Sequence, residues 1–447
     1  MNSFFKIAER RSTVMNEILA GIVTFMAMAY IMCVQPQIMS GTASGHPTGM
    51  DAGALITTTC LAAAFGCILM GFWANYPLGL APGMGENLFV VMTVIPLCAA
   101  ALGADSKTEP WQLALGAVFF AGVLFAVLTF LNVRKYLIDI ISPNLRYAMA
   151  GGIGLLIAFI GLKNAGMAVT ENGQMSLGSL ISAGPLVLAV GLIATASFHT
   201  LKIRGSILYG IIASAVCALF LGKIELTAPL GLPVNPMPVI GKIDFFGVFT
   251  HFTALFPLVL MLLFMQVFDT LGTVIGVGTQ AGIIQDDKFP DVEKVFAADA
   301  AATVAGALGG HSTVTAYIES VAGVECGGRT GLTAIVTGLC FIAALFCSPF
   351  IAVVGSYPPI TAAALVSVGA MMMQCVMKMT WNDASEAIPS FLILTCIPLT
   401  SNIADGIMIG LIIYPLVKFF SGKGHQIRWQ TYVLCLVLLL FMALRFI

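Results

Sequence analysis

The chain has 447 residues, of which 59% are hydrophobic and only 9% are charged, and its formal net charge is −1. Soluble globular domains are about 45–50% apolar and about 25% charged, so this composition excludes an ordinary soluble enzyme or binding module. The net charge favours no charged partner, and no basic cluster indicates binding to nucleic acid. A mean hydropathy of +0.99 predicts an all-α polytopic protein in the lipid bilayer.

The chain begins with a polar segment that carries Lys6, Arg10 and Arg11, and the first apolar run follows at 18–39. This run is too long for the core of a signal peptide, so it predicts a retained first span. Further apolar runs continue to the end of the chain. They lie at 53–73, 87–103, 111–131, 147–162, 184–199, 205–222, 250–280, 295–309, 320–326, 330–354, 358–377, 386–401, 402–420 and 430–447.

The first fourteen runs predict a core of fourteen spans. The run at 430–447 is then an extra span, unless 386–420 forms one long bent helix, and the sequence leaves both arrangements open. With the N-terminus inside, most of the twenty lysines and arginines lie on the cytoplasmic side. This asymmetry predicts a multi-pass protein of the cytoplasmic (inner) membrane with a cytoplasmic N-terminus.

The second half of the chain is expected to repeat the first half upside down. Seven predicted spans precede the proline-rich loop at 228–238 (APLGLPVNPMP), and seven follow it. An odd number of spans in each half inverts the second half relative to the first. Inverted repeats are typical of secondary transporters.

Two predicted spans are interrupted by extended stretches, Tyr76–Glu86 (YPLGLAPGMGE) and His311–Glu319 (HSTVTAYIE). Each stretch ends in a carboxylate, and a short apolar helix is expected after it, at 87–100 and 320–324. His311 opens the second break. Non-helical backbone at membrane depth occurs only where protein buries it or where it lines a cavity. A pair of such breaks in corresponding halves predicts a transporter's substrate site between them.

Acidic residues inside predicted spans are costly and mark functional sites. Those of this chain are Glu86, Asp269, Asp299, Glu319, Glu325 and Asp405. Glu319 precedes a half-helix whose free N–H groups point into the break. The strand at 312–316 is expected to offer unpaired N–H and C=O groups beside it. This combination suits a flat heterocycle with adjacent N–H and C=O groups; the alternative is that Glu319 caps its own helix.

Asp269 is the only charged residue in the span 258–278, and Thr270 and Thr273 give it a polar face. A lone aspartate at membrane depth must be protonated, paired or wet. Asp269 is therefore predicted to bind and release a proton, or else to make a structural hydrogen bond to another helix.

The other acids differ in their predicted roles. Asp299 lies in an Ala/Gly-rich run that permits close helix packing, which favours a structural hydrogen bond over a proton relay. Glu86 either lines the site opposite Glu319 or stabilises the start of its own helix. Glu325 and Asp405 lie near predicted span ends and are expected at the membrane interface.

Other chemistries have no signal in the sequence. The eleven cysteines lie mostly inside spans without metal-ligand spacing, so no metal or other cofactor is expected. No Walker A, HExxH or GxSxG motif is present, which argues against ATP-driven transport and against an enzyme.

Several segments together resemble one family over essentially the whole chain. They include PLGLAPGMGENLF (77–89), FDTLGTVIGV (268–277), STVTAYIESVAGVECGGRTGLTA (312–334) and NIADGIMIG (402–410). By these motifs the chain resembles the AzgA-like purine permeases. They belong to the nucleobase–cation symporter class, which also contains uracil and xanthine permeases.

This resemblance implies proton-coupled uptake of adenine, guanine or hypoxanthine by a fourteen-helix, seven-plus-seven inverted repeat. It implies a core domain of residues 1–132 and 248–355 that moves against a gate domain of residues 133–247 and 356–447. A homodimer is compatible with it. The alternative is a transporter of the same fold that carries another nucleobase or a small anion.

The resemblance also implies a set of site residues. Asp269 and Glu319 match the acidic pair that binds base and proton; Asp299 is a third proton-coupling candidate because of its place inside a predicted span. The other substrate-binding candidates are Glu86, Thr273, Ala81, Gly83, Gly85, Ala316, Tyr317, Ile318 and Ser320. Many relatives carry an uncharged residue where this chain has Glu86, so the substrate preference is left open.

Overall fold

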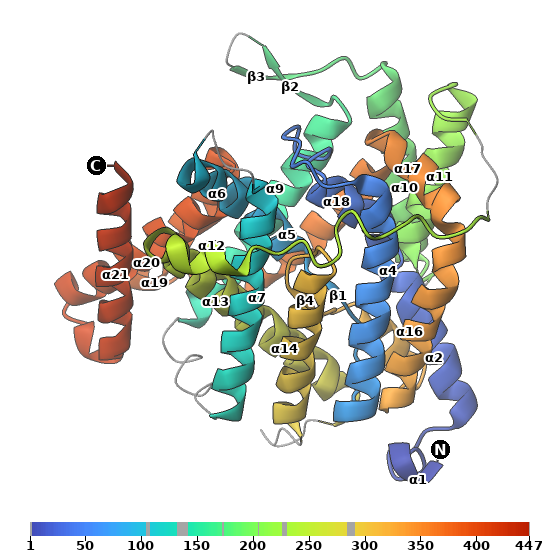
Figure 1. Cartoon of the computed structure of the whole chain (residues 1–447), viewed down its shortest axis with the longest axis horizontal. Helices are drawn as coiled ribbons and strands as arrows, with labels where there is room; N and C mark the ends of the chain where they lie inside the picture. The colour runs from blue at the N-terminus through green and yellow to red at the C-terminus, as the bar shows by residue number, and fades with distance from the viewer. Residues whose placement is uncertain are drawn as a thin grey trace.

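The computed structural model describes residues 2–103, 108–131, 142–171, 174–203, 205–225, 230–283 and 291–446. Helices dominate and stand side by side around a short pair of strands (Figure 1). Within the described ranges, nine helical stretches are long and apolar enough to cross a membrane. The prediction of an all-α polytopic membrane protein is confirmed, whereas the count of fourteen spans stays a prediction.

The first half of the chain contains ten described helices and two π-helical turns. The helices are α1 (Asn2–Phe5), α2 (Val14–Met28), α3 (Ile31–Met39), α4 (Ala52–Leu69), α5 (Met84–Phe89), α6 (Ile95–Leu102), α7 (Pro110–Phe130), α9 (Pro143–Asn164), α10 (Ala183–Thr200) and α11 (Ser206–Phe220). The π-helical turn η1 (Met70–Ala74) extends α4, and η2 (Val90–Val94) joins α5 to α6.

The second half contains ten described helices and three short 3-10 turns. Its helices are α12 (Phe245–Thr250), α13 (Phe252–Gln280), α14 (Val292–Leu308), α15 (Ser320–Glu325), α16 (Gly331–Ala344), α17 (Ser348–Ser356), α18 (Pro359–Met372), α19 (Ala384–Thr400), α20 (Ile403–Phe420) and α21 (Trp429–Phe446). Short 3-10 turns are η3 (Leu345–Cys347), η4 (Met373–Lys378) and η5 (Gly424–Gln426).

The C-terminal region contains three described helices. The region 386–420 forms two helices, because Ser401 adopts a left-handed conformation with φ 52° between α19 and α20. The last apolar run forms α21, which packs on α20 at one edge of the molecule (Figure 1). The division into core and gate domains stays a prediction, and its border at 132–133 lies outside the described residues.

Each predicted break contains a strand, and the two strands pair with each other. β1 (Leu80–Pro82) and β4 (Val314–Ala316) run antiparallel, with Ala81 opposite Thr315. The strands lie in the middle of the molecule, next to α14 and α4 (Figure 1). Two halves of the chain therefore meet at one buried backbone ribbon. A second antiparallel pair is formed by β2 (Ala168–Glu171) and β3 (Gln174–Leu177).

The first short helix begins earlier than the sequence analysis predicted. α5 starts at Met84 with Gly83 as its N-cap, so Glu86 lies inside the first helical turn. Gly-Met-Gly is compatible with either extended or helical backbone. Local sequence therefore does not determine where the break ends.

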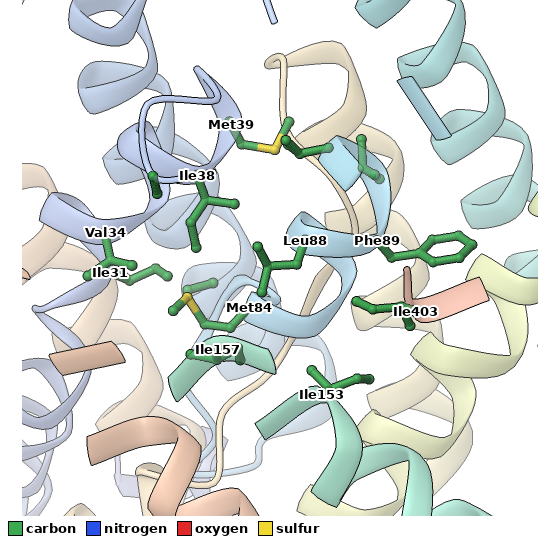
Figure 2. Packing of buried hydrophobic residues seen from close by; sticks show 14 of the residues in the cluster. Ile31, Val34, Ile38, Met39, Met84, Leu88, Phe89, Ile153, Ile157 and Ile403 are labelled. Carbon is green, nitrogen blue, oxygen red and sulfur yellow. The ribbon is translucent and has the colours of Figure 1, made fainter. Parts of the chain in front are cut away.

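Apolar side chains from distant parts of the chain hold α5 in place. In Figure 2, side chains of α5 lie among those of α3, α9 and α20. The labelled residues are Met84, Leu88 and Phe89 of α5, Ile31, Val34, Ile38 and Met39 of α3, Ile153 and Ile157 of α9, and Ile403 of α20. Since α9 and α20 belong to the predicted gate domain, the face between it and α5 is apolar.

One buried carboxylate ties α2 to the start of α16. Glu17 Oε1 accepts a hydrogen bond from the Arg329 N–H at 3.0 Å, and its Oε2 accepts from the Thr330 N–H at 3.2 Å. The Thr333 hydroxyl also donates to Oε2, at 2.6 Å. Free N–H groups at a helix start need such acceptors. Glu17 thereby caps a helix more than 300 residues away in the chain.

We expect Glu17→Leu to destabilise the protein. The substitution leaves buried backbone N–H groups without an acceptor, which costs about 1–3 kcal/mol for each group. The apparent midpoint of thermal unfolding of the detergent-purified protein should fall, and Glu17→Gln, which keeps one acceptor oxygen, should lower it less. Equal midpoints for wild type and Glu17→Leu would contradict this role.

Candidate functional site

The outer edges of the strand pair are occupied by side chains. The Leu80 N–H and C=O both bond to the Cys67 thiol, at 3.1 and 3.2 Å. The Val314 N–H and C=O both bond to the Thr303 hydroxyl, each at 3.1 Å. The expectation that β4 offers unpaired groups to a ligand is therefore wrong at Val314, because α14 places a threonine against that edge.

Glu319 is the last residue of the second break, and its side chain contacts Tyr30 at the start of α3. It is the N-cap residue of α15, yet its side chain makes no capping bond to that helix. Instead, its Oε1 accepts a hydrogen bond from the Tyr30 hydroxyl at 2.8 Å. The interpretation of Glu319 as a cap of its own helix is thus wrong. Sequence reasoning missed Tyr30, whose only signal was a phenol inside the first predicted span.

Asp269 of α13 is both paired and accessible to solvent. Its Oδ2 accepts a hydrogen bond from the Thr315 hydroxyl of β4 at 3.0 Å. The residue is nevertheless exposed, and a Cβ added at Gly272, one turn further along, would meet no atom within 4 Å. Thr273 is buried on the same helix. Asp269 therefore reaches an open space while it is bonded to the strand.

Glu86 is buried and its side chain lies beside Gly83, just after β1. A Cβ on Gly83 would clash with Glu86 Oε2, and the Thr315 hydroxyl oxygen is 3.2 Å from the same position. Thr315 is also the donor to Asp269. The carboxyl groups of Glu86 and Asp269 thus flank one threonine, which places Glu86 within the candidate site.

Gly83→Ala is expected to weaken substrate binding, because the new methyl group would occupy the place of the Glu86 carboxylate. Measured uptake should show a raised KM. Gly355→Ala is the matched control, since its Cβ would meet its nearest atom at an ordinary contact distance of 3.7 Å. An unchanged KM in Gly83→Ala would remove Glu86 from the site.

Asp299 of α14 makes the structural hydrogen bonds that the sequence analysis favoured. Its Oδ2 accepts from the Thr270 hydroxyl at 2.7 Å and from the Gln266 amide at 3.1 Å, and both donors belong to α13. Asp299 is fully buried, in contrast to Asp269. The two aspartates are linked because adjacent residues of α13, Asp269 and Thr270, contact β4 and α14.

His311 belongs to a buried polar network that the sequence did not predict. The Gln35 amide donates to Asn87 Oδ1 at 3.0 Å and lies 3.2 Å from His311 Nδ1. An amide N–H can only donate, so Nδ1 accepts and the Nε2–H donates to the Thr58 hydroxyl at 2.8 Å. The Ser312 hydroxyl donates to Asn87 Oδ1 as well. This network joins α3, α4 and α5 to the start of the second break.

The remaining candidates divide into supporting residues and residues at the open side. The Tyr317 hydroxyl donates to the Pro82 carbonyl at 2.5 Å, and the Ser320 hydroxyl accepts from the Gly79 N–H at 2.9 Å. Both tie the two breaks together. Ala81, Ala316 and Gly85 are buried, Ile318 is 46% exposed, Glu325 is the last residue of α15, and Asp405 lies in the first turn of α20.

Proteins of known activity resemble the chain over nearly its full length. It is 38% identical to the guanine/hypoxanthine permease PbuO of Bacillus subtilis, with 95% of this chain and 96% of that protein covered. It is 36% identical to the adenine permease AdeQ of Escherichia coli, with 98% and 94% covered.

Solved structures share the fold at low sequence identity. The transmembrane domain of the cyanobacterium bicarbonate transporter BicA matches with a TM-score of 0.60 at 15% identity, over 89% of this chain and 97% of that one. The murine anion transporter Slc26a9 in its inward-facing state matches with a TM-score of 0.60 at 12% identity, over 92% and 69%.

The sequence profile of the Permease family matches residues 15–409, which include both breaks and all the acidic residues described above. Together with the full-length relatives, this match confirms the resemblance predicted from the motifs. The chain is a multi-pass membrane protein, and it belongs to the Permease family.

Proposed function

We propose that this protein is a secondary active transporter that takes up a purine nucleobase together with a proton across the cytoplasmic membrane. The observation that carries the proposal is the placement of two carboxyl groups at β4. Asp269 binds the hydroxyl of Thr315 within the strand, and Glu319 follows the strand and binds Tyr30. The names of the full-length relatives support a purine as the substrate.

The site has the chemistry that a purine base requires. An ionised carboxylate accepts hydrogen bonds from adjacent N–H groups of a base, and a protonated carboxyl also donates one. The Tyr30 hydroxyl bonds to Oε1 of Glu319 and so fixes the orientation of the carboxyl group. Lone pairs remain on the carboxylate for the N–H groups of a flat heterocycle. Hydrogen bonds to charged groups are the strong ones, worth about 1.5–3 kcal/mol each.

The proposed cycle follows from charge. A proton binds among Asp269, Glu319 and Asp299 and lowers the negative charge that the core domain carries across the membrane. The base then binds at Glu319 and Asp269. The loaded core moves against the gate domain along the apolar face of α5 and releases base and proton to the cytoplasm (Figure 2).

An accessible face of α13 and α15 supports release at one end of these helices. Asp269, Gly272 and Gln280 are exposed on α13, and Glu325 is exposed at the end of α15. The Gln280 amide donates to the Glu325 carboxylate at 3.2 Å. In the predicted orientation this end faces the cytoplasm.

A small anion is the competing substrate, since the solved structures with this fold include a bicarbonate transporter and an anion transporter. Their likeness concerns the fold alone. The acids Glu86, Asp269, Asp299 and Glu319 beside the strands repel an anion unless they are neutralised. The charge of the site therefore favours the nucleobase.

Uptake of labelled adenine, guanine and hypoxanthine tests the proposal in cells that lack their own purine carriers. Concentrative uptake of one base that collapses with a protonophore is the expected result, and it names the substrate. Uptake that the protonophore does not change would contradict coupling to a proton. If none of the three bases is taken up although the protein is present in the membrane, the proposal of a purine substrate is contradicted.

A further inference from the structure

A carboxyl group and an amide face each other in the buried layer behind β4. Asp299 of α14 and Gln266 of α13 are both 0% exposed, and the Gln266 Nε2 donates to Asp299 Oδ2 at 3.1 Å. The other oxygen of each group, Asp299 Oδ1 and Gln266 Oε1, is buried without a hydrogen-bond partner. Most buried polar atoms are bonded, so two orphaned acceptors in one pair need an explanation.

Thr303 fixes the orientation of the Gln266 amide. The Thr303 hydroxyl donates its single hydrogen to the Val314 C=O and accepts from the Val314 N–H. It can therefore only accept from Gln266, which makes the atom that faces it the amide nitrogen. The second N–H of the same nitrogen then points at Asp299 Oδ2. The amide oxygen is left with no donor.

An ionised Asp299 has no hydrogen with which to satisfy this oxygen. A protonated Asp299 with its hydrogen on Oδ1 becomes a donor, and Gln266 Oε1 is the unpartnered acceptor on the amide beside it. Acid and amide would then exchange two hydrogen bonds, one already present and one supplied by the proton. Both buried oxygens would then have a partner, which removes the cost of leaving them unsatisfied.

We infer that Asp299 and Gln266 form a carboxylic acid–amide pair that holds the coupling proton of the transport cycle on Asp299 Oδ1. The inference rests on the proposed proton-coupled transport and assigns the proton to one of its candidate groups. Gln266 is then a positioning residue that acts through Asp299. The base is left to Asp269 and Glu319, which reach the accessible side.

The charges around the pair agree with a neutral acid. Carboxyl groups of Asp269 on α13 and Glu86 on α5 act on Asp299 electrostatically. The other elements packed against α14, namely α4, η1, α7, β1 and β4, contain no Asp, Glu, Lys or Arg. On α14 itself, Lys294 is paired with Asp291 at 2.8 Å in an exposed contact. None of the elements packed against α14 brings a positive charge to Asp299, whereas Asp269 and Glu86 bring negative ones.

Two threonines connect the Asp299–Gln266 pair to β4 and to Asp269. Thr303 bonds both backbone polar groups of Val314 in β4. Thr270, which follows Asp269 directly in α13, donates to Asp299. Loss of the proton leaves a buried negative charge between α13 and α14, with Asp299 Oδ1 and Gln266 Oε1 unsatisfied. Helix α13 carries Asp269, and helix α14 carries Thr303, which holds β4 in place. Loss of the proton therefore changes the geometry of the site that binds the base.

Asp299→Asn is the sharp test, because asparagine imitates the protonated acid. Its amide can donate to Gln266 Oε1 and accept from Gln266 Nε2, but it carries no exchangeable coupling proton. In proteoliposomes, exchange of labelled base against unlabelled base should be retained, whereas accumulation driven by a pH gradient should be lost. Uphill accumulation by Asp299→Asn at the wild-type level would overturn the inference.

Infrared difference spectroscopy of the purified protein gives a readout that needs no substrate. The C=O band of a protonated carboxylic acid should disappear in Asp299→Asn and shift to higher frequency in Gln266→Leu, because the acid loses its amide partner. A band that neither substitution changes would overturn the pair. Failure of all purine uptake with this band present would instead overturn the proposed substrate and leave the pair standing.

Discussion

Glu319→Gln is expected to weaken binding of the base and to slow its uptake while the protein still folds. Glutamine has the shape of glutamate and keeps an oxygen that can accept the hydrogen bond from Tyr30. It loses the negative charge that strengthens the hydrogen bonds from the N–H groups of the base. A hydrogen bond to a charged group is worth about 1.5–3 kcal/mol, so affinity should fall by about tenfold or more. Equilibrium binding and initial uptake rates measure the two effects.

Tyr30→Phe separates the orientation of Glu319 from its charge. This variant keeps the carboxylate and removes only the hydroxyl that bonds to Oε1. It should raise KM less than Glu319→Gln does and should retain accumulation. If Glu319→Gln accumulates the base as the wild type does, Glu319 does not bind the transported molecule.

Asp269→Asn is expected to have the second large effect, a loss of affinity of about tenfold or more by the same argument. The amide keeps the size of the side chain and can still accept from Thr315. It removes a negative charge that is exposed on the open side of α13. Binding of the labelled base to purified protein should weaken, and a Kd equal to that of the wild type would exclude Asp269 from the site.

A pair of threonines on the same stretch provides the control for Asp269. Thr315 donates to Asp269, whereas the hydroxyl of Thr313 is buried without a partner. Thr315→Val should therefore raise KM, because Asp269 loses the bond that orients it. Thr313→Val removes the same atoms without breaking a bond and should leave KM unchanged.

The sequence by itself determined the features that depend on local patterns. Long apolar runs predicted the spans because insertion into a membrane depends on the length and polarity of one segment at a time. The stretches that contain β1 and β4 were identified because Gly, Pro and β-branched residues interrupt the apolar helices there. Asp269 and Glu319 stood out because charges inside spans are rare.

Only the tertiary structure decided what these residues contact. Tyr30 and Glu319 are 289 positions apart, and Thr315 and Asp269 are 46 positions apart, so no local pattern indicates either bond. The same holds for Thr303, which covers the edge of β4 that was expected to be free. Partners of buried polar groups come from whichever helix packs alongside, and packing is a property of the whole chain.

The start of α5 and the pair of Asp299 with Gln266 show the same limit. Gly-Met-Gly permits either backbone, so contacts of α5 with α3, α9 and α20 decided that Glu86 lies in a helix. Gln266 is one uncharged residue in a long apolar span, and the sequence alone gave it no significance. Its role follows from the side chains of α14 that meet it. The sequence determined where polar groups enter the membrane, and the tertiary structure determined which of them are satisfied, because hydrogen bonds are completed between distant segments.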